Sequence, residues 1–109
     1  MHELSITQSV VDAVVERLPD TRIASIQLEI GKLSGIVADS VRFCFELVVD
    51  GTPLEGARLD IDEPGGRAHC ARCDTDFDLS DSILLCPCGS ADVAVLEGQQ
   101  LRIKSVEVV

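Results

Sequence analysis

Four cysteines between residues 70 and 88 constrain this chain more than any other feature. Cys70 and Cys73 are separated by two residues, Cys86 and Cys88 by one, and twelve residues lie between the two pairs. Each pair can supply two thiolates from one tight turn, and the loop between them can fold back to bring the pairs together. Four thiolates favour tetrahedral Zn²⁺ with Zn–S distances of about 2.3 Å. The spacing therefore predicts a structural zinc site, although the second pair has a shorter spacer than usual.

Other uses of these thiols fit the sequence less well. Nothing at the N-terminus resembles a secretory signal, and cytosolic thiols stay reduced, so disulfides are not expected. A thioredoxin-like redox motif would lie between a strand and a helix, whereas this motif follows Pro64-Gly65-Gly66 and precedes an acidic loop. Iron–sulfur clusters use other cysteine spacings. A catalytic zinc ion needs an open position, which four protein ligands do not leave.

The charge and composition narrow the possible functions further. The formal net charge is −10, and residues 67–95 carry five aspartates against two arginines. Nucleic-acid binding requires Lys and Arg to neutralise phosphates, so a nucleic-acid partner is not expected. No apolar run approaches the roughly 18 residues of a membrane span. These features predict a soluble cytoplasmic protein without a membrane partner.

The hydrophobic pattern predicts five regular elements around one small core. Apolar residues at helical spacing predict helices over about 3–18 and 38–49. Alternating or apolar runs predict strands over 23–33, 57–63 and 101–108, the last with a change of face near Ser105. The expected fold is α/β (α+β), with two helices packed on a three-stranded sheet. A zinc-ribbon-like module is inserted between the second and third strands.

Some side chains of this core can be assigned in advance. In the first strand, Ala24 is expected on the inner face and Ser25 on the outer face. Asp39 or Ser40 could cap the second helix. The inner face of that helix is expected to include Leu47 and also the residues Val41, Cys44, Phe45 and Val48. Cys44 lies in an apolar setting and is interpreted as a small hydrophobic residue.

The N-terminal residues Met1-His2-Glu3 form a second candidate metal site. The amine of Met1, the amide nitrogen of His2 and its imidazole can chelate one ion, and Glu3 could complete the set by its carboxylate or backbone. Nitrogen-rich square-planar coordination suits Ni²⁺ and Cu²⁺. The alternative is a surface histidine on a frayed terminus, with Glu3 favourably placed at a helix N-terminus. His69 is expected to be exposed beside Cys70, and its alternative role is that of a substitute zinc ligand.

Several segments together resemble one known family. These segments are Met1–Ser5, Leu28–Gly31, Phe43–Glu46, Gly56–Leu59, Cys70–Cys73, Cys86–Ser90 and Leu101–Glu107. The chain resembles, over essentially its full length, the HypA/HybF nickel metallochaperones of NiFe-hydrogenase maturation. In that family the second cysteine pair is normally Cys-x-x-Cys, and this chain lacks one residue there.

The resemblance implies a carrier with two metals. Nickel, as transferable cargo, would bind at Met1, His2 and Glu3, and structural zinc at Cys70, Cys73, Cys86 and Cys88. It implies a nickel-binding domain over 1–66, completed by 96–109 as its final strand, and a zinc-binding domain over 67–95. The implied partners are a hydrogenase-maturation GTPase and the hydrogenase large-subunit precursor, with urease as a further client in some relatives. The chain would act as a monomer or homodimer.

Two other functions remain as alternatives. A zinc-ribbon adaptor would bind proteins without carrying a transferable metal, and a thiol enzyme would need a reactive cysteine of low pKa. The sequence contains no recognisable Ser-His-Asp or carboxylate-pair arrangement, so we do not expect an enzyme.

Overall fold

The computed structural model describes residues 2–81 and 83–109, with the side chain of His2 excluded. The chain divides into two compact units. The first, here called the helical unit, consists of Met1–Leu28, Ile36–Ile61 and Arg102–Val109. The second, the cysteine unit, consists of Glu29–Gly35 and Asp62–Leu101. Each unit has its own sheet and its own small core, and each is described separately.

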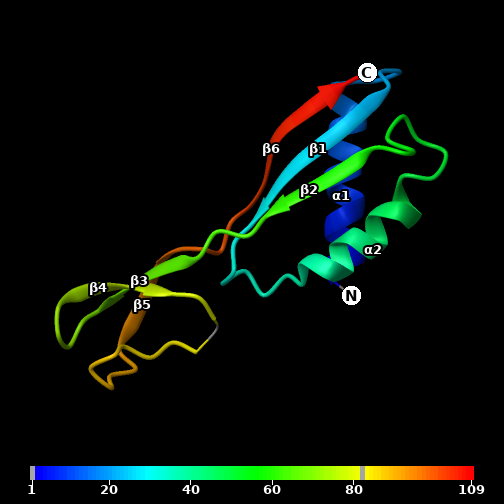
Figure 1. The fold of residues 1–109 in the computed structure, drawn as a ribbon. Helices are drawn as coiled ribbons and strands as arrows, with labels where there is room; N and C mark the ends of the chain where they lie inside the picture. The colour runs from blue at the N-terminus through cyan, green and yellow to red at the C-terminus, as the bar shows by residue number, and fades with distance from the viewer. Residues whose placement is uncertain (1, 82) are drawn as a thin grey trace. The chain divides into compact units, whose positions relative to one another are not determined.

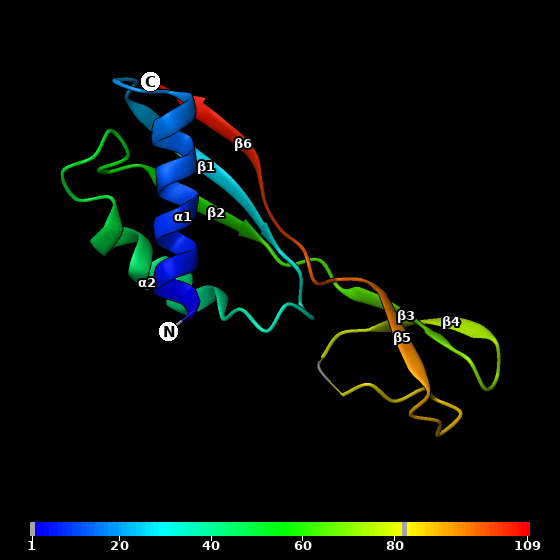
Figure 2. The ribbon, with the colours of Figure 1, turned by 180° about the vertical axis from the view of Figure 1, so that it is seen from behind.

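In the described part of the chain, the helical unit contains two helices and one three-stranded sheet, as the sequence predicts. The helices are α1 (His2–Arg17) and α2 (Ala38–Val48). The strands are β1 (Ile23–Ile30), β2 (Arg58–Asp62) and β6 (Leu101–Val108), in the order β2-β1-β6. Figure 1 shows β1 and β2 running in one direction and β6 in the other, and Figure 2 shows α1 lying across one face of this sheet.

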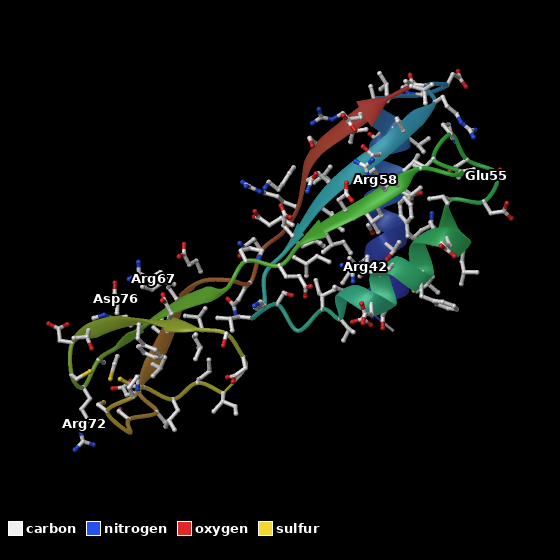
Figure 3. All side chains as sticks on the ribbon, in the orientation of Figure 1. Arg42, Glu55, Arg58, Arg67, Arg72 and Asp76 are labelled. Atoms are coloured by element: carbon white, nitrogen blue, oxygen red, sulfur yellow. The ribbon has the colours of Figure 1, made fainter. Side chains whose placement is uncertain are left out.

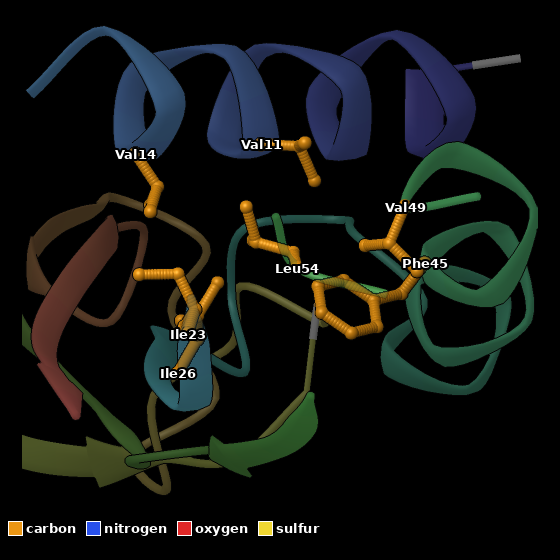
Figure 4. Close-up of a cluster of buried hydrophobic side chains, with 7 residues drawn as sticks. All are labelled: Val11, Val14, Ile23, Ile26, Phe45, Val49 and Leu54. Carbon is orange, nitrogen blue, oxygen red and sulfur yellow. The ribbon is translucent and has the colours of Figure 1, made fainter. Parts of the chain in front are cut away.

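The core of the helical unit lies between the helices and the sheet. Its buried members are aliphatic apart from one phenylalanine (Figure 4): Val11, Val14, Ile23, Ile26, Phe45, Val49 and Leu54. Ile26 and Leu54 are completely buried. Burying one such side chain contributes about 1.5–3 kcal/mol. Ile103 and Val106 of β6 both pack against this core, which confirms the change of face near Ser105.

Strand β1 ends at Ile30, three residues earlier than predicted. The N–H of Gly31 donates to the carbonyl of Gln100 at 2.8 Å, and the N–H of Leu33 donates to the carbonyl of Gly98 at 2.8 Å. These bonds hold the chain within the cysteine unit after β1. A Cβ atom on Gly31 would lie 2.0 Å from the carbonyl oxygen of Gly98, so only glycine fits this approach.

Three assignments of single residues are wrong. Ala24 is exposed, and Ser25 is buried, with its hydroxyl donating to Glu107 Oε1 at 2.6 Å. Leu47 is 61% exposed and therefore lies outside the core. The N-cap residue of α2 is Val37, so neither Asp39 nor Ser40 occupies that position. Asp39 instead forms an ion pair with Arg42 at 2.7 Å, and Figure 3 shows Arg42 on this helix.

The cysteine unit is built on a second sheet. Its strands are β3 (Gly66–Cys70), β4 (Thr75–Leu79) and β5 (Val93–Glu97), in the antiparallel order β4-β3-β5. Cys70 pairs with Thr75 on one side and with Val93 on the other. The core is small and consists of Leu33, Ala68 and Leu79, flanked by Phe77, Val93 and Val95.

Among the residues that the structure describes, no helix combines the length and apolar character needed to cross a membrane.

Candidate metal centre

Two tight turns position the four predicted cysteines. Cys70 ends β3, and its carbonyl accepts a hydrogen bond at 2.8 Å from the N–H of Asp74, whose φ is +56°. This closes the turn that carries Cys73. In the second turn the carbonyl of Cys86 accepts from the N–H of Gly89 at 2.8 Å, and φ of Gly89 is +95°, a value that glycine adopts without strain. Both pairs therefore present sulfur atoms from fixed backbone loops.

The four sulfur atoms form one cluster. All lie within 4.8 Å of one another. The Sγ atoms of Cys70 and Cys88 are 3.8 Å apart, and those of Cys73 and Cys86 are 3.6 Å apart. A tetrahedron with metal–sulfur bonds of about 2.3 Å has sulfur–sulfur edges of about 3.8 Å. The cluster is thus compatible with one tetrahedral ion, and the one-residue spacer of the second pair does not prevent this arrangement.

The electrostatic environments of the two buried thiols differ. Cys70 and Cys86 are buried, whereas Cys73 and Cys88 are exposed. The backbone N–H of Cys73, assisted by that of Arg72, lowers the pKa of Cys70 to about 6 against the effect of burial. The hydrogen bond from the backbone N–H of Cys88 lowers the pKa of Cys86, but burial and the neighbouring thiols outweigh it and raise that pKa to about 12. Four adjacent thiolates would repel one another, and a divalent cation removes this repulsion.

Two polar residues that the sequence analysis missed support the cluster. The hydroxyl of Thr75 lies 2.9 Å from the sulfur of Cys73. The hydroxyl of Ser90, a buried residue, accepts the N–H of Asp92 at 3.1 Å and so braces the chain after the second turn. In the sequence, the only indication that Thr75 could contact the cluster is its position two residues after Cys73.

His69 interacts with carboxylates. It does not belong to the metal-ligand cluster, which among the described residues contains the four cysteines alone. Its Nδ1 lies 2.6 Å from Asp76 Oδ1, and its Nε2 lies 3.2 Å from Asp74 Oδ1. The hydrogen bond to Asp76 is the main cause that raises the pKa of His69, and both carboxylate charges add to it. Asp76 also lies 3.8 Å from the guanidinium of Arg67 (Figure 3). The alternative role of His69 as a substitute ligand therefore gains no support.

The predicted N-terminal site lies only partly within the described residues. Met1 and the imidazole of His2 lie outside them, while the backbone of His2 begins α1. Glu3 is in the first turn of α1, where its Oε2 accepts the N–H of Val37 at 3.2 Å. The chelate of Met1, His2 and Glu3 remains a prediction.

The comparisons with known proteins decide the family. The family model described as "Hydrogenase/urease nickel incorporation, metallochaperone, hypA" matches residues 1–108. The chain belongs to the HypA family. Relatives named hydrogenase maturation factor HypA are 47% identical in Geobacter sulfurreducens, over 99% of each chain, and 45% identical in Nostoc sp., over 99% of this chain and 96% of the relative.

The fold agrees with that of the HypA family. The solution structure of the Ni metallochaperone HypA from Helicobacter pylori superimposes with a TM-score of 0.64 at 20% identity, and covers 98% of this chain and 97% of that one. The two helices with their sheet, and the module that carries the four cysteines, are therefore features of a HypA fold.

Proposed function

We propose that this chain is a nickel metallochaperone that binds Ni²⁺ at its N-terminus and delivers it during maturation of NiFe-hydrogenase. The observation that carries the proposal is the match to the nickel-incorporation family over residues 1–108, which includes the N-terminal triplet. Relatives in that family are named hydrogenase maturation factors. Urease is a second possible client, because the family description names both enzymes.

The donor atoms of the N-terminus suit this cargo. The ligands in the proposal are the amine of Met1, the amide nitrogen and imidazole of His2, and Glu3, which completes the set by its carboxylate or backbone. The first four N–H groups of an α-helix have no intrahelical acceptor, and α1 begins at His2, so the helix does not use this amide. The amine and imidazole must lose protons to bind, and nickel affinity therefore falls as the pH is lowered.

The cysteine cluster, in this proposal, holds a structural Zn²⁺ ion. Cys70, Cys73, Cys86 and Cys88 supply four thiolates with distances that fit a tetrahedron. Four protein ligands leave no open position for catalysis. The ion would instead stabilise a unit whose described apolar cluster is small, with Leu33, Ala68 and Leu79 as its buried members.

The proposed carrier acts on other proteins and has no catalytic turnover. Its partners in the proposal are a hydrogenase-maturation GTPase and the hydrogenase large-subunit precursor, and its location is the cytoplasm. A ligand set at a chain terminus is accessible, so that an ion can move to a partner by stepwise ligand exchange. In the proposal, each predicted domain binds one metal. The domain of residues 1–66 and 96–109 binds nickel, and the domain of residues 67–95 binds zinc.

Calorimetric nickel titration of the zinc-loaded protein tests this function. The native protein is compared with His2→Ala, with a variant that has one residue added before Met1, and with His69→Ala as a control. We expect the native protein and the control to bind one Ni²⁺, and the other two variants to lose it while they keep their zinc. If all four proteins bind nickel alike, or none binds it, the chelate is wrong and a zinc-ribbon adaptor becomes the better account.

A further inference from the structure

The carboxylate of Glu3 joins the first turn of α1 to the beginning of α2. Its Oε2 accepts a hydrogen bond at 3.2 Å from the N–H of Val37, 34 residues later in the chain. Val37 is the N-cap residue of α2, with extended backbone angles of φ −88° and ψ 109°. This position usually holds Ser, Thr, Asp or Asn, whose side-chain oxygen binds the exposed N–H groups of the helix. Valine has no such atom, and the carboxylate of Glu3 supplies the negative charge there instead.

The main chain of Glu3 is held by a second contact. The hydroxyl of Thr7 donates to the carbonyl of Glu3 at 2.6 Å, and Thr7 is 1% exposed. This bond gives the buried hydroxyl of Thr7 a partner, whose absence would be costly, and it fixes the carbonyl of Glu3. Glu3 is therefore held through its backbone by α1 and through its side chain by the start of α2.

We propose that Glu3 is a positioning residue for nickel. Its carboxylate holds Val37 in both the empty and the loaded protein and so fixes the first turn of α1 at the residue that follows Met1 and His2. Glu3 then completes the ligand set through its backbone. Ordering a residue on binding costs backbone entropy, so a ligand residue that is already ordered before binding takes up the ion more tightly. This inference rests on the proposed function and specifies how the same site is held.

Substitutions on both sides of the hydrogen bond separate positioning from direct coordination. Glu3→Gln keeps an acceptor oxygen but removes the carboxylate, whereas Glu3→Ala removes both. Val37→Pro removes the donor N–H at a φ of −88°, which lies within about 25° of the value for proline, and Val37→Ala keeps the donor as its control. Glu16→Ala removes an exposed glutamate from the last turns of the same helix and controls for lost charge. Nickel binding to each zinc-loaded variant is measured by calorimetry.

A positioning role predicts a specific pattern of affinities. Glu3→Ala and Val37→Pro should each bind nickel about tenfold more weakly, as expected for the loss of one hydrogen bond to a charged group. Glu3→Gln, Val37→Ala and Glu16→Ala should stay within about threefold of the native protein. The double variant Glu3→Ala/Val37→Pro should be no weaker than either single variant, because both remove the same bond.

Three results would overturn the inference. A Glu3→Gln variant as weak as Glu3→Ala would make the carboxylate a ligand, and a Val37→Pro variant as tight as Val37→Ala would make the bond irrelevant to nickel. Additive losses in the double variant would mean that the two residues act separately. If the native protein itself binds no nickel, the proposed function fails first, so the two failures are distinguishable.

Hydrogen exchange gives a readout that does not depend on affinity. The amide hydrogen of Val37 should exchange slowly in the native protein, with or without nickel, and faster in Glu3→Ala. The exchange is quenched, nickel is removed, and the remaining protons are counted by NMR. Loss of protection when nickel is added would show that the carboxylate leaves Val37 for the ion, and the positioning role would be wrong.

Discussion

At the scale of single residues, charged side chains near the cysteine cluster carry specific interactions. Asp76 binds His69 on one side and lies near Arg67 on the other. The sequence shows only an acidic loop here, and the pairing of β3 with β4 brings His69 opposite Asp76. The strand register therefore gives Asp76, one of several acidic residues of this loop, a specific partner in His69.

The substitution Asp76→Asn should lower the pKa of His69 toward its ordinary value of about 6.5, because the main cause that raises it is the hydrogen bond to Asp76. A raised pKa means that the folded state favours the protonated imidazole. Its contribution to stability is therefore fully present below about pH 6.5 and is lost as the pH rises through the folded-state pKa. NMR titration of the imidazole protons measures the shift. Asp78→Asn is the control, and an equal effect of both substitutions would contradict the assignment.

At the scale of elements, burial separates two leucines that the sequence alone does not distinguish. Leu47 lies in α2 and is 61% exposed, while Leu54 follows that helix and is completely buried in the core. The helical pattern placed Leu47 inside because apolar residues surround it. The structure shows that Val41 and Phe45 occupy the inner positions of α2.

We expect Leu54→Ala to reduce the free energy of unfolding by about 2–5 kcal/mol, the range for a buried leucine. Leu47→Ala should change it by less than about 0.5 kcal/mol, as is usual for an exposed position. Chemical denaturation followed by circular dichroism gives both values. Similar losses for the two variants would mean that Leu47 is buried in solution.

Two glycines offer a second matched comparison. Gly31→Ala places a Cβ atom 2.0 Å from the carbonyl oxygen of Gly98, so the backbone must move, at a cost of about 1–3 kcal/mol. No described atom lies within 4 Å of the corresponding position at Gly65. Gly65→Ala should therefore be neutral or stabilise the protein by up to about 1 kcal/mol. Thermal unfolding of both variants tests this, and a neutral Gly31→Ala would contradict the close approach.

At the scale of the whole molecule, the chain supports two cores of unequal size. Among the described residues, the buried hydrophobic cluster of the helical unit has seven members and that of the cysteine unit has three. A core of three residues buries little apolar surface, and small modules of this kind depend on metals or disulfides. The stability of the second unit should therefore depend on the ion that we propose its four thiolates hold.

Removal of the metal by a chelator, or Cys73→Ser, should unfold the cysteine unit and leave the helical unit folded. In two-dimensional NMR spectra the amide signals of Ala68 and Leu79 should collapse into the range of unfolded chains. Those of Val11 and Ile26 should keep their dispersion. The prediction fails if the metal-free protein retains both sets, or if both are lost together.

Much of this organisation follows from local patterns. Helical periodicity, strand alternation and cysteine spacing depend on neighbouring residues, and they correctly predicted both helices, the first sheet and the clustering of the four cysteines. The strands of the cysteine unit were not predicted, and for β4 the reason is its polar pattern. In β4, aspartates at positions 76 and 78 flank Phe77, and long-range pairing with β3 stabilises the strand instead of an apolar face.

The sequence by itself determined the kinds of elements and the ligands that could meet, because propensity, periodicity and thiol chemistry are properties of nearby residues. Only the tertiary structure decided that Ser25 is buried, that Leu47 is exposed and that Glu3 accepts the N–H of Val37 at the start of α2. Two of these features involve a contact between residues distant in the chain: Ser25 with Glu107, and Glu3 with Val37. Such contacts leave no local signature, since either partner alone resembles an ordinary surface residue.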